Sequence, residues 1–379
     1  MKKILAVILA AVMMLTVMAG CNNANSANNG EDAIIKKVAL VTDVGTIDDE
    51  SFNQACWQAV EAWCGANKVD YVYYQPSEDS TDARVLSVGQ AVAEGANVIV
   101  MPGYLFGATL IHVQEQYPDV YFVAIDVAAG DLTEDYETYY DPAANAVCAT
   151  FAEEQAGYLA GYAAVKDGYT KLGFLGGMAV PAVIRYGYGY VQGCNDAAAE
   201  LGITVDVNYN YGGQFFGDDT ITARMDGWYS EGTEIVFACG GGIYTSALAA
   251  ALNYDAKVIG VDVDQHYIGE NKDVCPDYNP FVTSAMKGLQ NVTETILDEL
   301  NKGNWDNYSG KFVNYSLAEG EYVGIPTEEA SWGFTTFTVE EYEAVKAAIK
   351  DGSVSVDNNS SEADVSKYDF SNVNVKYVA

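Results

Sequence analysis

The chain of 379 residues carries 53 acidic and 19 basic side chains, which gives a formal net charge of −34 at pH 7. A surface with this much negative charge argues against binding of nucleic acid and of anionic ligands, and it favours a neutral or cationic solute. About 350 residues are left once the N-terminal segment is set aside, too many for one hydrophobic core, so two domains are expected.

The first 20 residues have the pattern of a signal peptide. Lys2 and Lys3 precede an apolar run at 4–17 that is too short to span a bilayer, and Ala-Gly then leads to Cys21. A cysteine at this position is typical of a bacterial lipoprotein, in which the chain is cut before the cysteine and fatty acids such as palmitate are attached to it. We therefore expect Cys21 to anchor the protein on the extracytoplasmic face of the cell membrane. The alternative is an ordinary secreted protein in which Cys21 is incidental.

The segment after the cysteine, NNANSANNG at 22–30, is polar and uncharged. Such a segment cannot bury a core, so residues 21–33 are interpreted as the lipidated cysteine and a flexible tether. Loss of Lys2 and Lys3 with the signal peptide leaves 17 basic against 53 acidic residues, a net charge of −36.

The remaining cysteines are interpreted as buried thiols. They lie mostly among apolar neighbours, their spacings form no compact disulfide framework, and Cys56 and Cys64 are too far apart along one helix to bond. The chain has only two histidines, His112 and His266, and no paired Cys/His spacing, so no metal site is expected. The cysteines interpreted as buried thiols are Cys56, Cys64, Cys148, Cys194, Cys239 and Cys275.

Beyond the tether, short apolar runs alternate with helix-length segments. Repeated βα units predict parallel sheets with helices on both faces, so the expected fold class is α/β, with two doubly wound parallel-sheet lobes joined by a hinge. Strands are predicted at 38–41, 71–74, 98–101, 120–125, 171–175, 205–209, 235–238, 258–261 and 281–286, and helices at 83–94, 106–116, 151–166, 182–201, 244–253, 288–300 and 339–350.

The first run of βα units ends near 141–150, and a second exchange is placed after Val263. The first lobe is accordingly predicted to contain 34–145 and 279–310, and the second lobe 146–278 and 311–352. Residues 353–379 are polar and poor in aliphatic side chains, and they are interpreted as a loosely packed tail.

The first strand-to-helix turn is the strongest candidate for a binding site. In an open α/β sheet the ligand lies beyond the carboxyl ends of the strands, where this turn is expected. The turn and the helix start carry carboxylates at Asp43, Asp48 and Asp49, a ring at Phe52 and an amide at Asn53. Carboxylates accept from hydroxyls, an amide bonds a heterocycle edge and a ring stacks on a base, so the set suits a nucleoside or a sugar and repels a phosphate.

A purely structural reading of the same turn is open at this point. Thr46 and Asp49 have the spacing of a capping box, the acids would complement the helix dipole, and Phe52 would be a core residue.

Residues 43–54, DVGTIDDESFNQ, resemble the opening signature D-x-G-G-I-D-D-x-S-F-N of the basic membrane protein family. These are nucleoside-binding lipoproteins of bacterial ABC importers, and only Thr46 departs from the pattern, where the family usually has glycine. The resemblance implies a type I periplasmic-binding-protein fold and recognition of a purine nucleoside. The ligand-binding residues it implies in this stretch are Asp43, Asp49, Phe52, Asn53 and Gln54.

Later strand ends extend the resemblance to about residue 300. Residues 101–106 resemble the family's G-x-G-F-x-F, with Met101-Pro102 replacing its start, which implies that Gly103 contacts the ligand. Asp126 lies at the end of its strand, as the family's acidic ligand residue does. Residues 213–218 are similar to G-S-F-x-D, where a phenylalanine closes the second face of the base. Phe216 matches best, and Phe215 is its rival because this chain carries one extra residue.

The remaining ligand residues come from the second lobe. The run CGGG at 239–242 lacks the lysine and hydroxyl residue of a P-loop, so Gly240 is expected to let the backbone approach a ribose. Asp262 and Asp264 match G-V-D-x-D-Q, and Lys287 matches the family's basic residue after T-S. Taken singly, each aspartate could be a strand-end cap and Lys287 a solvated helix start.

The function implied is a monomeric, lipid-anchored receptor without cofactor that passes a nucleoside to an ABC permease and its ATPase. The base would lie between Phe52 and Phe216 with Asn53 and Asp126 at its edge, and Asp262 and Lys287 would hold the ribose.

The alternatives are a receptor for a free sugar or riboflavin and, in another class, a nucleoside hydrolase with calcium. Dispersed acids and the absence of a Ser-His-Asp or metal spacing argue against the hydrolase. A transcription regulator of the same fold is excluded by the signal peptide and the lack of a basic helix-turn-helix.

Overall fold

The computed structural model describes residues 34–43 and 45–378. The expected signal peptide, Cys21 and the tether at 21–33 lie outside these residues. Across the described part, none of the helices combines the length and the apolar character that a membrane crossing needs. From Ile35 onward the chain forms one compact unit, which contains both sheets of the fold.

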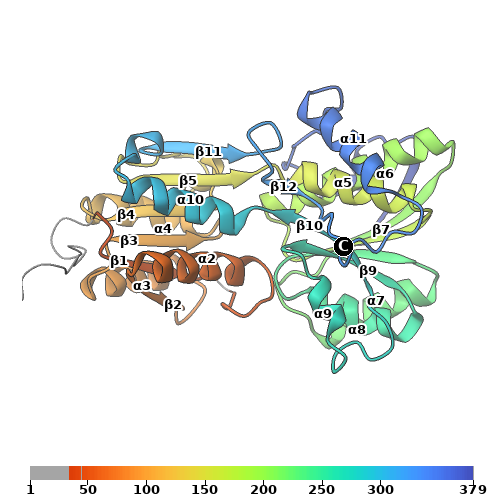
Figure 1. Cartoon of the computed structure of the whole chain (residues 1–379), viewed down its shortest axis with the longest axis horizontal. Coiled ribbons are helices and arrows are strands. Elements are labelled where there is room, and N and C mark those ends of the chain that lie inside the picture. Colours follow the sequence, from red (N-terminus) through yellow and green to blue (C-terminus); the bar gives the residue numbers. More distant parts are fainter. Residues whose placement is uncertain (1–33, 44, 379) are drawn as a thin grey trace, which may run out of the picture. The chain divides into compact units, whose positions relative to one another are not determined.

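The first sheet has six strands in the order β11-β5-β4-β3-β1-β2, and its strands pair in parallel (Figure 1). Its central strands are buried on both faces, as parallel strands covered by helices must be. With their helices these strands form the first lobe: β1 (Lys37–Val41), α2 (Phe52–Asn67), β2 (Asp70–Tyr74), α3 (Thr81–Ala93), β3 (Val98–Pro102), α4 (Phe106–Gln116), β4 (Tyr121–Ile125), η1 (Ala129–Asp131), β5 (Ala146–Phe151), α10 (Leu289–Asn301), η2 (Trp305–Asn307) and β11 (Lys311–Tyr315).

The second sheet has seven strands in the order β12-β10-β9-β8-β6-β7-β13. The short strand β12 is antiparallel to β10, and the other pairs are parallel. The second lobe contains α5 (Glu153–Lys166), β6 (Lys171–Gly176), α6 (Pro181–Leu201), β7 (Val205–Tyr211), α7 (Asp219–Ser230), β8 (Ile235–Cys239), α8 (Tyr244–Tyr254), β9 (Lys257–Asp262), α9 (His266–Glu270), β10 (Phe281–Lys287), β12 (Val323–Gly324), α11 (Val339–Lys350), η3 (Val365–Lys367) and β13 (Val373–Tyr377).

The two sheets repeat one strand order. Read from β2, the first sheet runs β2-β1-β3-β4-β5-β11, and the second, read from β7, runs β7-β6-β8-β9-β10-β12. The ends of β4 and β9 therefore occupy equivalent positions in the two lobes. Among the described residues, the strand β13 has no counterpart in the first sheet.

The predicted lobe boundaries need correction at three strands. β5 and β11 belong to the first sheet, where they pair with each other, and β10 belongs to the second, where it pairs with β9 (Figure 1). The chain therefore crosses between the lobes after Phe151, after Lys287 and after Tyr315. The physical reason is that strands of both sheets have the same apolar pattern, so a βα unit does not show in its sequence which sheet its strand will join.

The interpretation of 353–379 as a loosely packed tail is wrong for its described part, residues 353–378. β13 pairs in parallel with β7 along its whole length, and Val365 is fully buried. Tyr368 stacks on Tyr188 with ring centroids 4.4 Å apart. Aromatic side chains and strand pairing fix this segment where aliphatic residues are few.

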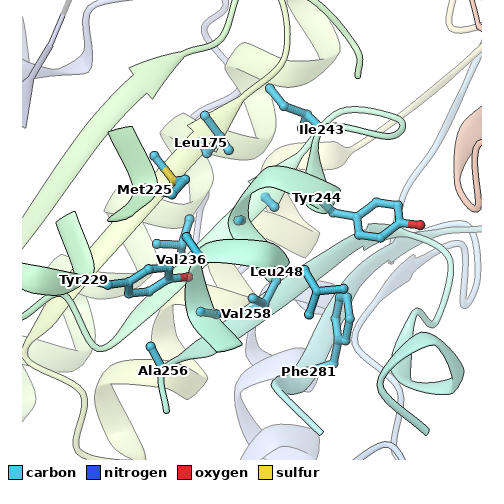
Figure 2. Packing of buried hydrophobic residues seen from close by; sticks show 14 of the residues in the cluster. Leu175, Met225, Tyr229, Val236, Ile243, Tyr244, Leu248, Ala256, Val258 and Phe281 are labelled. Carbon is cyan, nitrogen blue, oxygen red and sulfur yellow. The ribbon is translucent and has the colours of Figure 1, made fainter. Parts of the chain in front are cut away.

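The second lobe has a continuous apolar core between its sheet and helices α7 and α8. Met225 and Tyr229 of α7 lie against Val236 and Val258 of the sheet (Figure 2). Tyr244 stands at the edge of this cluster, with its hydroxyl pointing away from the other labelled side chains (Figure 2). The prediction of buried thiols is confirmed for the six described cysteines, which are free and buried.

Candidate functional site

A cavity of about 600 Å³ lies among residues that follow strand ends of both sheets. The carboxyl ends of parallel strands meet at one edge of a sheet, so loops from distant parts of the chain come together there. Ten of the twelve ligand residues predicted from the sequence line it: Asp43, Asp49, Phe52, Asn53, Gly103, Asp126, Phe216, Gly240, Asp262 and Lys287.

Asp49 both lines the cavity and caps helix α2. Its carboxylate accepts backbone N–H bonds from Ser51, Asn53 and Gln54 at 3.0 to 3.1 Å, which satisfies donors that a helix start leaves open. Burial raises the pKa of Asp49 to about 6, although these hydrogen bonds oppose the rise. Asp49 therefore fixes the start of the helix, but the capping box expected between Thr46 and Asp49 is wrong, because the helix begins at Phe52 with Ser51 as its N-cap.

Asn53 is oriented by two aspartates. Its amide nitrogen donates to Asp43 Oδ1 at 3.2 Å and to Asp49 Oδ2 at 3.3 Å. Its amide oxygen is buried and has no hydrogen-bond partner among the described residues. The amide thus offers a fixed acceptor to a ligand in the cavity.

The ammonium of Lys287, at the end of β10, lies among three buried carboxylates. It donates to Asp126, and it lies 3.5 Å from Glu153 Oε1 and 3.6 Å from Asp262 Oδ1. Burial lowers the pKa of Lys287, but attraction to these carboxylates outweighs burial and holds the pKa above its ordinary value. The Ser51 hydroxyl joins the cluster by donating to Asp262 Oδ2 at 2.7 Å.

A second cation completes the buried charges. Arg185 of α6 bonds Glu153 Oε2 at 2.7 Å and lies 4.0 Å from Glu154 Oε2. Burial raises the pKa of Glu153, but Arg185 and Lys287 outweigh burial, so the pKa lies below its ordinary value.

The carboxylates of Asp126, Glu153, Glu154 and Asp262 thus share the two cations Lys287 and Arg185. The excess of negative charge accompanies raised pKa values at two of the four carboxyls. Burial, with repulsion from Glu153, raises the pKa of Asp126 to about 7 against the opposing pull of Lys287. The same two causes raise the pKa of Glu154 to about 7. One oxygen of Asp126, Oδ1, is buried without a hydrogen-bond partner in the described chain. It is therefore a second polar atom that a ligand can satisfy.

Aromatic rings surround the charged cluster. The Lys287 ammonium lies 4.7 Å from the centre of the Phe52 ring, and 5.7 Å from that of Tyr186. Phe215 and Phe216 both line the cavity, but they differ in packing. Phe215 rests on two glycines, because a Cβ at Gly177 would lie 2.5 Å from its ring and one at Gly240 would lie 3.0 Å from it. Phe216 is packed less closely than Phe215, and 62% of the residue is exposed to solvent.

Two predicted ligand residues lie elsewhere. The Gln54 amide bonds Glu50 twice, at 2.9 Å each, and Glu50 in turn accepts a bond from Tyr267 of the second lobe. Asp264 lines a different cavity, of about 440 Å³, and accepts bonds from the His266 backbone and the Ser331 hydroxyl. Gln54 therefore supports the turn, and Asp264 links the start of α9 to Ser331.

The family of the chain is shown by its sequence. The profile described as ABC transporter substrate-binding protein, PnrA-like (Bmp), matches residues 36–359. The chain belongs to this family. The resemblance found in residues 43–54 is thereby confirmed, and this Bmp-family protein is a substrate-binding component of an ABC transporter, a family of extracytoplasmic binders rather than catalysts.

Similar proteins support the same placement. The ABC transporter nucleoside-binding protein BmpA of Lactococcus lactis subsp. cremoris is 30% identical over 337 residues, which are 84% of this chain and 90% of that protein. A solute-binding protein of an ABC transporter system from Aeropyrum pernix K1 has a TM-score of 0.66 at 20% identity, covering 85% of this chain and 88% of that chain. One from Conexibacter woesei DSM 14684 has a TM-score of 0.65 at 21% identity, covering 85% and 99%. These structures confirm the expected fold.

Sequence reasoning missed several residues of the Bmp-family cavity. Arg185 of α6 lines the cavity, and its buried partner Glu153 is the first residue of α5. The available signal was an arginine within a mostly apolar helix of a strongly acidic chain. Tyr186, which also lines the cavity, belongs to none of the matched motifs. Other lining residues that the motifs did not point to are Asp79, Asp131 and Tyr244.

Proposed function

We propose that this Bmp-family receptor binds a nucleoside, in particular a purine nucleoside, and delivers it to an ABC permease. The observation that carries the proposal is the buried cluster of Asp126, Lys287 and Asp262 beside the face of Phe52. Such a cluster offers charged acceptors and one charged donor to the hydroxyls of a ribose, and the ring offers a stacking surface to a base.

The buried acceptors favour a ligand with several donors. Asn53 Oδ1 and Asp126 Oδ1 have no partner among the described residues, and leaving such atoms unmet costs about 1–3 kcal/mol each. A nucleoside has hydroxyl and ring N–H donors that can meet both. A free base lacks the hydroxyls, so part of the cluster would stay unsatisfied, and we expect it to bind weakly.

The charge of the cavity disfavours phosphorylated ligands. Seven aspartates line it, against the two cations Arg185 and Lys287, which are already paired with carboxylates. A phosphate would meet repulsion without an unpaired cation, so nucleotides should be excluded. The seven aspartates are Asp43, Asp48, Asp49, Asp79, Asp126, Asp131 and Asp262.

The cellular setting follows from the lipoprotein pattern at Cys21. A receptor anchored there by its acyl chains and carried on the 21–33 tether would work as a monomer at the outer surface of the cell membrane, next to the permease and its ATPase. The Lactococcus relative is a nucleoside-binding protein of an ABC transporter, which supports the proposal of a nucleoside receptor.

Calorimetric titration tests the proposal. The chain from Asn22 is unfolded and refolded to remove bound solute, and it is titrated with guanosine, adenosine, inosine, uridine, ribose, adenine and riboflavin. Tight binding of a purine nucleoside, together with weak binding of ribose and adenine, is the expected result.

Other outcomes would redirect the assignment. Binding of ribose or riboflavin alone would overturn the nucleoside and leave a receptor for another solute. Release of free base during the titration, detected by chromatography, would instead point to a nucleoside hydrolase.

A further inference from the structure

The second sheet has one strand more than the first, and this strand lies at the C-terminal end of the described chain. β13 pairs in parallel with β7 from Val373 opposite Val205 to Tyr377 opposite Tyr209. It begins 14 residues beyond the family match, which ends at residue 359. Without β13, β7 would be the edge strand of its sheet, as its counterpart β2 is in the first.

Beyond the paired residues, Val378, which directly follows β13, contacts the carboxyl end of β7. The Val378 backbone N–H donates to the Tyr209 carbonyl at 2.8 Å, and the Asn210 side chain donates to the Val378 carbonyl at 2.5 Å. Asn210 is buried, and its amide oxygen accepts a bond from Arg224 of α7. The end of β7 is thus tied to β13 on one side and to α7 on the other.

An aromatic cluster joins the same elements. Tyr377 of β13 lies 6.0 Å from Tyr209 and 6.4 Å from Tyr211 between ring centres, and the hydroxyls of Tyr209 and Tyr211 are 3.0 Å apart. Tyr209 also stacks on Phe174 of β6 at 4.4 Å. These rings cover the carboxyl end of β7, after which the chain continues into the loop that lines the cavity.

The loop that follows β7 carries the second aromatic wall of the cavity. Gly212 and Gly213 donate to the Gly176 and Gly177 carbonyls at 2.8 and 3.0 Å, and residues 213–217 then line the cavity with Phe215 and Phe216. Within the loop, Phe216 forms an isolated bridge with Gly242, Phe215 packs against Gly177 and Gly240, and the Gln214 side chain donates to the Phe216 carbonyl. Because the loop continues directly from β7, fraying of β7 would shift its first residues and with them Phe215 and Phe216.

We propose that β13 is a positioning element of the binding cavity, which holds the carboxyl end of β7 and with it the Phe215–Phe216 loop. This inference rests on the proposed function for its effect on binding, but the effect on the loop itself is independent of the ligand. An edge strand opens more readily than an inner one, since half of its backbone groups lack partners. β13 converts the strand before the aromatic loop into an inner strand.

The experiment compares the chain from Asn22 to Ala379 with a chain shortened after Asn372. Amide hydrogen exchange is measured without ligand, and guanosine affinity is measured by calorimetry. Exchange at 209–217 should become about tenfold or more faster in the shortened chain, while the amides of β3 and β4 keep their rates. Guanosine affinity should fall several-fold.

Two point variants separate positioning from a general loss of folding. Tyr377→Ala removes the ring that contacts β7 and should accelerate exchange at 209–217 in a folded protein. Lys376→Ala, at the neighbouring exposed position of β13, should leave exchange and affinity unchanged. Unchanged exchange at 209–217 in the shortened chain or in Tyr377→Ala overturns the proposal. If the intact chain binds none of the nucleosides, the nucleoside assignment fails, and the exchange rates still decide whether β13 holds the loop.

Discussion

Asp126 and Asp262 occupy equivalent positions in the two sheets and share one unusual backbone conformation. Asp126 follows β4 and Asp262 ends β9, the equivalent strand, and their φ angles are 59° and 66°. Aspartate is among the few residues that tolerate this left-handed region, where its carboxylate leaves the strand direction. Both carboxylates thereby reach the ammonium of Lys287, one from each lobe.

The first prediction concerns Asp126. Asp126→Asn keeps the size of the side chain, but it removes the charge that pairs with Lys287 and an acceptor available to the ligand. At pH 8, where the wild-type carboxyl is ionised, guanosine affinity should fall by about 1.5–3 kcal/mol. Calorimetry measures this change, and Asp119→Asn, at an exposed position of the same lobe, provides the control. Equal affinity in Asp126→Asn and wild type would remove Asp126 from the proposed site.

The second prediction separates the two adjacent phenylalanines. Phe216 is exposed beside the cavity, so Phe216→Ala should lower nucleoside affinity by about 1–3 kcal/mol with no change in melting temperature. Phe215 rests on Gly177 and Gly240, so Phe215→Ala should lower the free energy of unfolding by about 1–2 kcal/mol. Titration and thermal unfolding of both variants test the assignment. The opposite pattern, in which Phe215→Ala alone loses affinity, would make Phe215 the stacking residue.

Much of the fold and part of the site could be predicted from the sequence because the signals are local. Apolar runs and helix-length segments gave the βα units, and strand-end motifs pointed to Asp43, Phe52, Asp126 and Asp262. Whether a strand such as β5 joins one sheet or the other depends on contacts far along the chain, and no local pattern carries that choice. For the same reason, the pairing of β13 with β7 could not be predicted from the sequence.

The charge network of the site was beyond local reasoning for a similar reason. Lys287 was expected on a ribose beside Asp262, but its bond to Asp126 joins residues 161 positions apart. Glu153 and Arg185 lie in two helices, and only their packing shows that each neutralises the other. Gln54 was predicted to bind the ligand because it lies in the binding motif, but its amide instead donates to Glu50.

The third prediction concerns the backbone at Gly103. Its φ is +121°, and a Cβ there would lie 2.6 Å from Asp43 Oδ2. Gly103→Ala should therefore lower the free energy of unfolding by about 1–3 kcal/mol and displace the Asp43 carboxylate from its place beside Asn53. Gly130→Ala is a matched control in the same lobe, because a Cβ at Gly130 meets nothing within 4 Å. Denaturant unfolding of the two variants gives the comparison, and equal stability would contradict the close approach.

The last prediction is a pH dependence that depends on Glu154. The structure places this carboxyl in a helix beside Glu153, with Arg185 at 4.0 Å and the Asp357 charge nearby, and its Oε2 atom has no hydrogen-bond partner among the described residues. Burial raises its pKa from 4.5 to about 7. Between these two values the folded protein keeps a proton that the unfolded chain has released. The free energy of unfolding contributed by Glu154 therefore falls as the pH rises from 4.5 to 7, and it stays low above pH 7.

Glu154→Gln replaces the titrating group by a neutral one of the same shape, so this slope should disappear. The variant should be more stable than wild type by about 1–3 kcal/mol at pH 8, and the difference should be small at pH 5. Asp49, Asp126 and Asp131 have raised pKa values too, but they are present in both proteins, so their contributions cancel in the comparison. Urea unfolding at the two pH values measures the effect, with Glu115→Gln on the exposed side of α4 as control. Parallel pH profiles of Glu154→Gln and wild type would show that Glu154 is ionised without cost, and that Arg185 neutralises both glutamates.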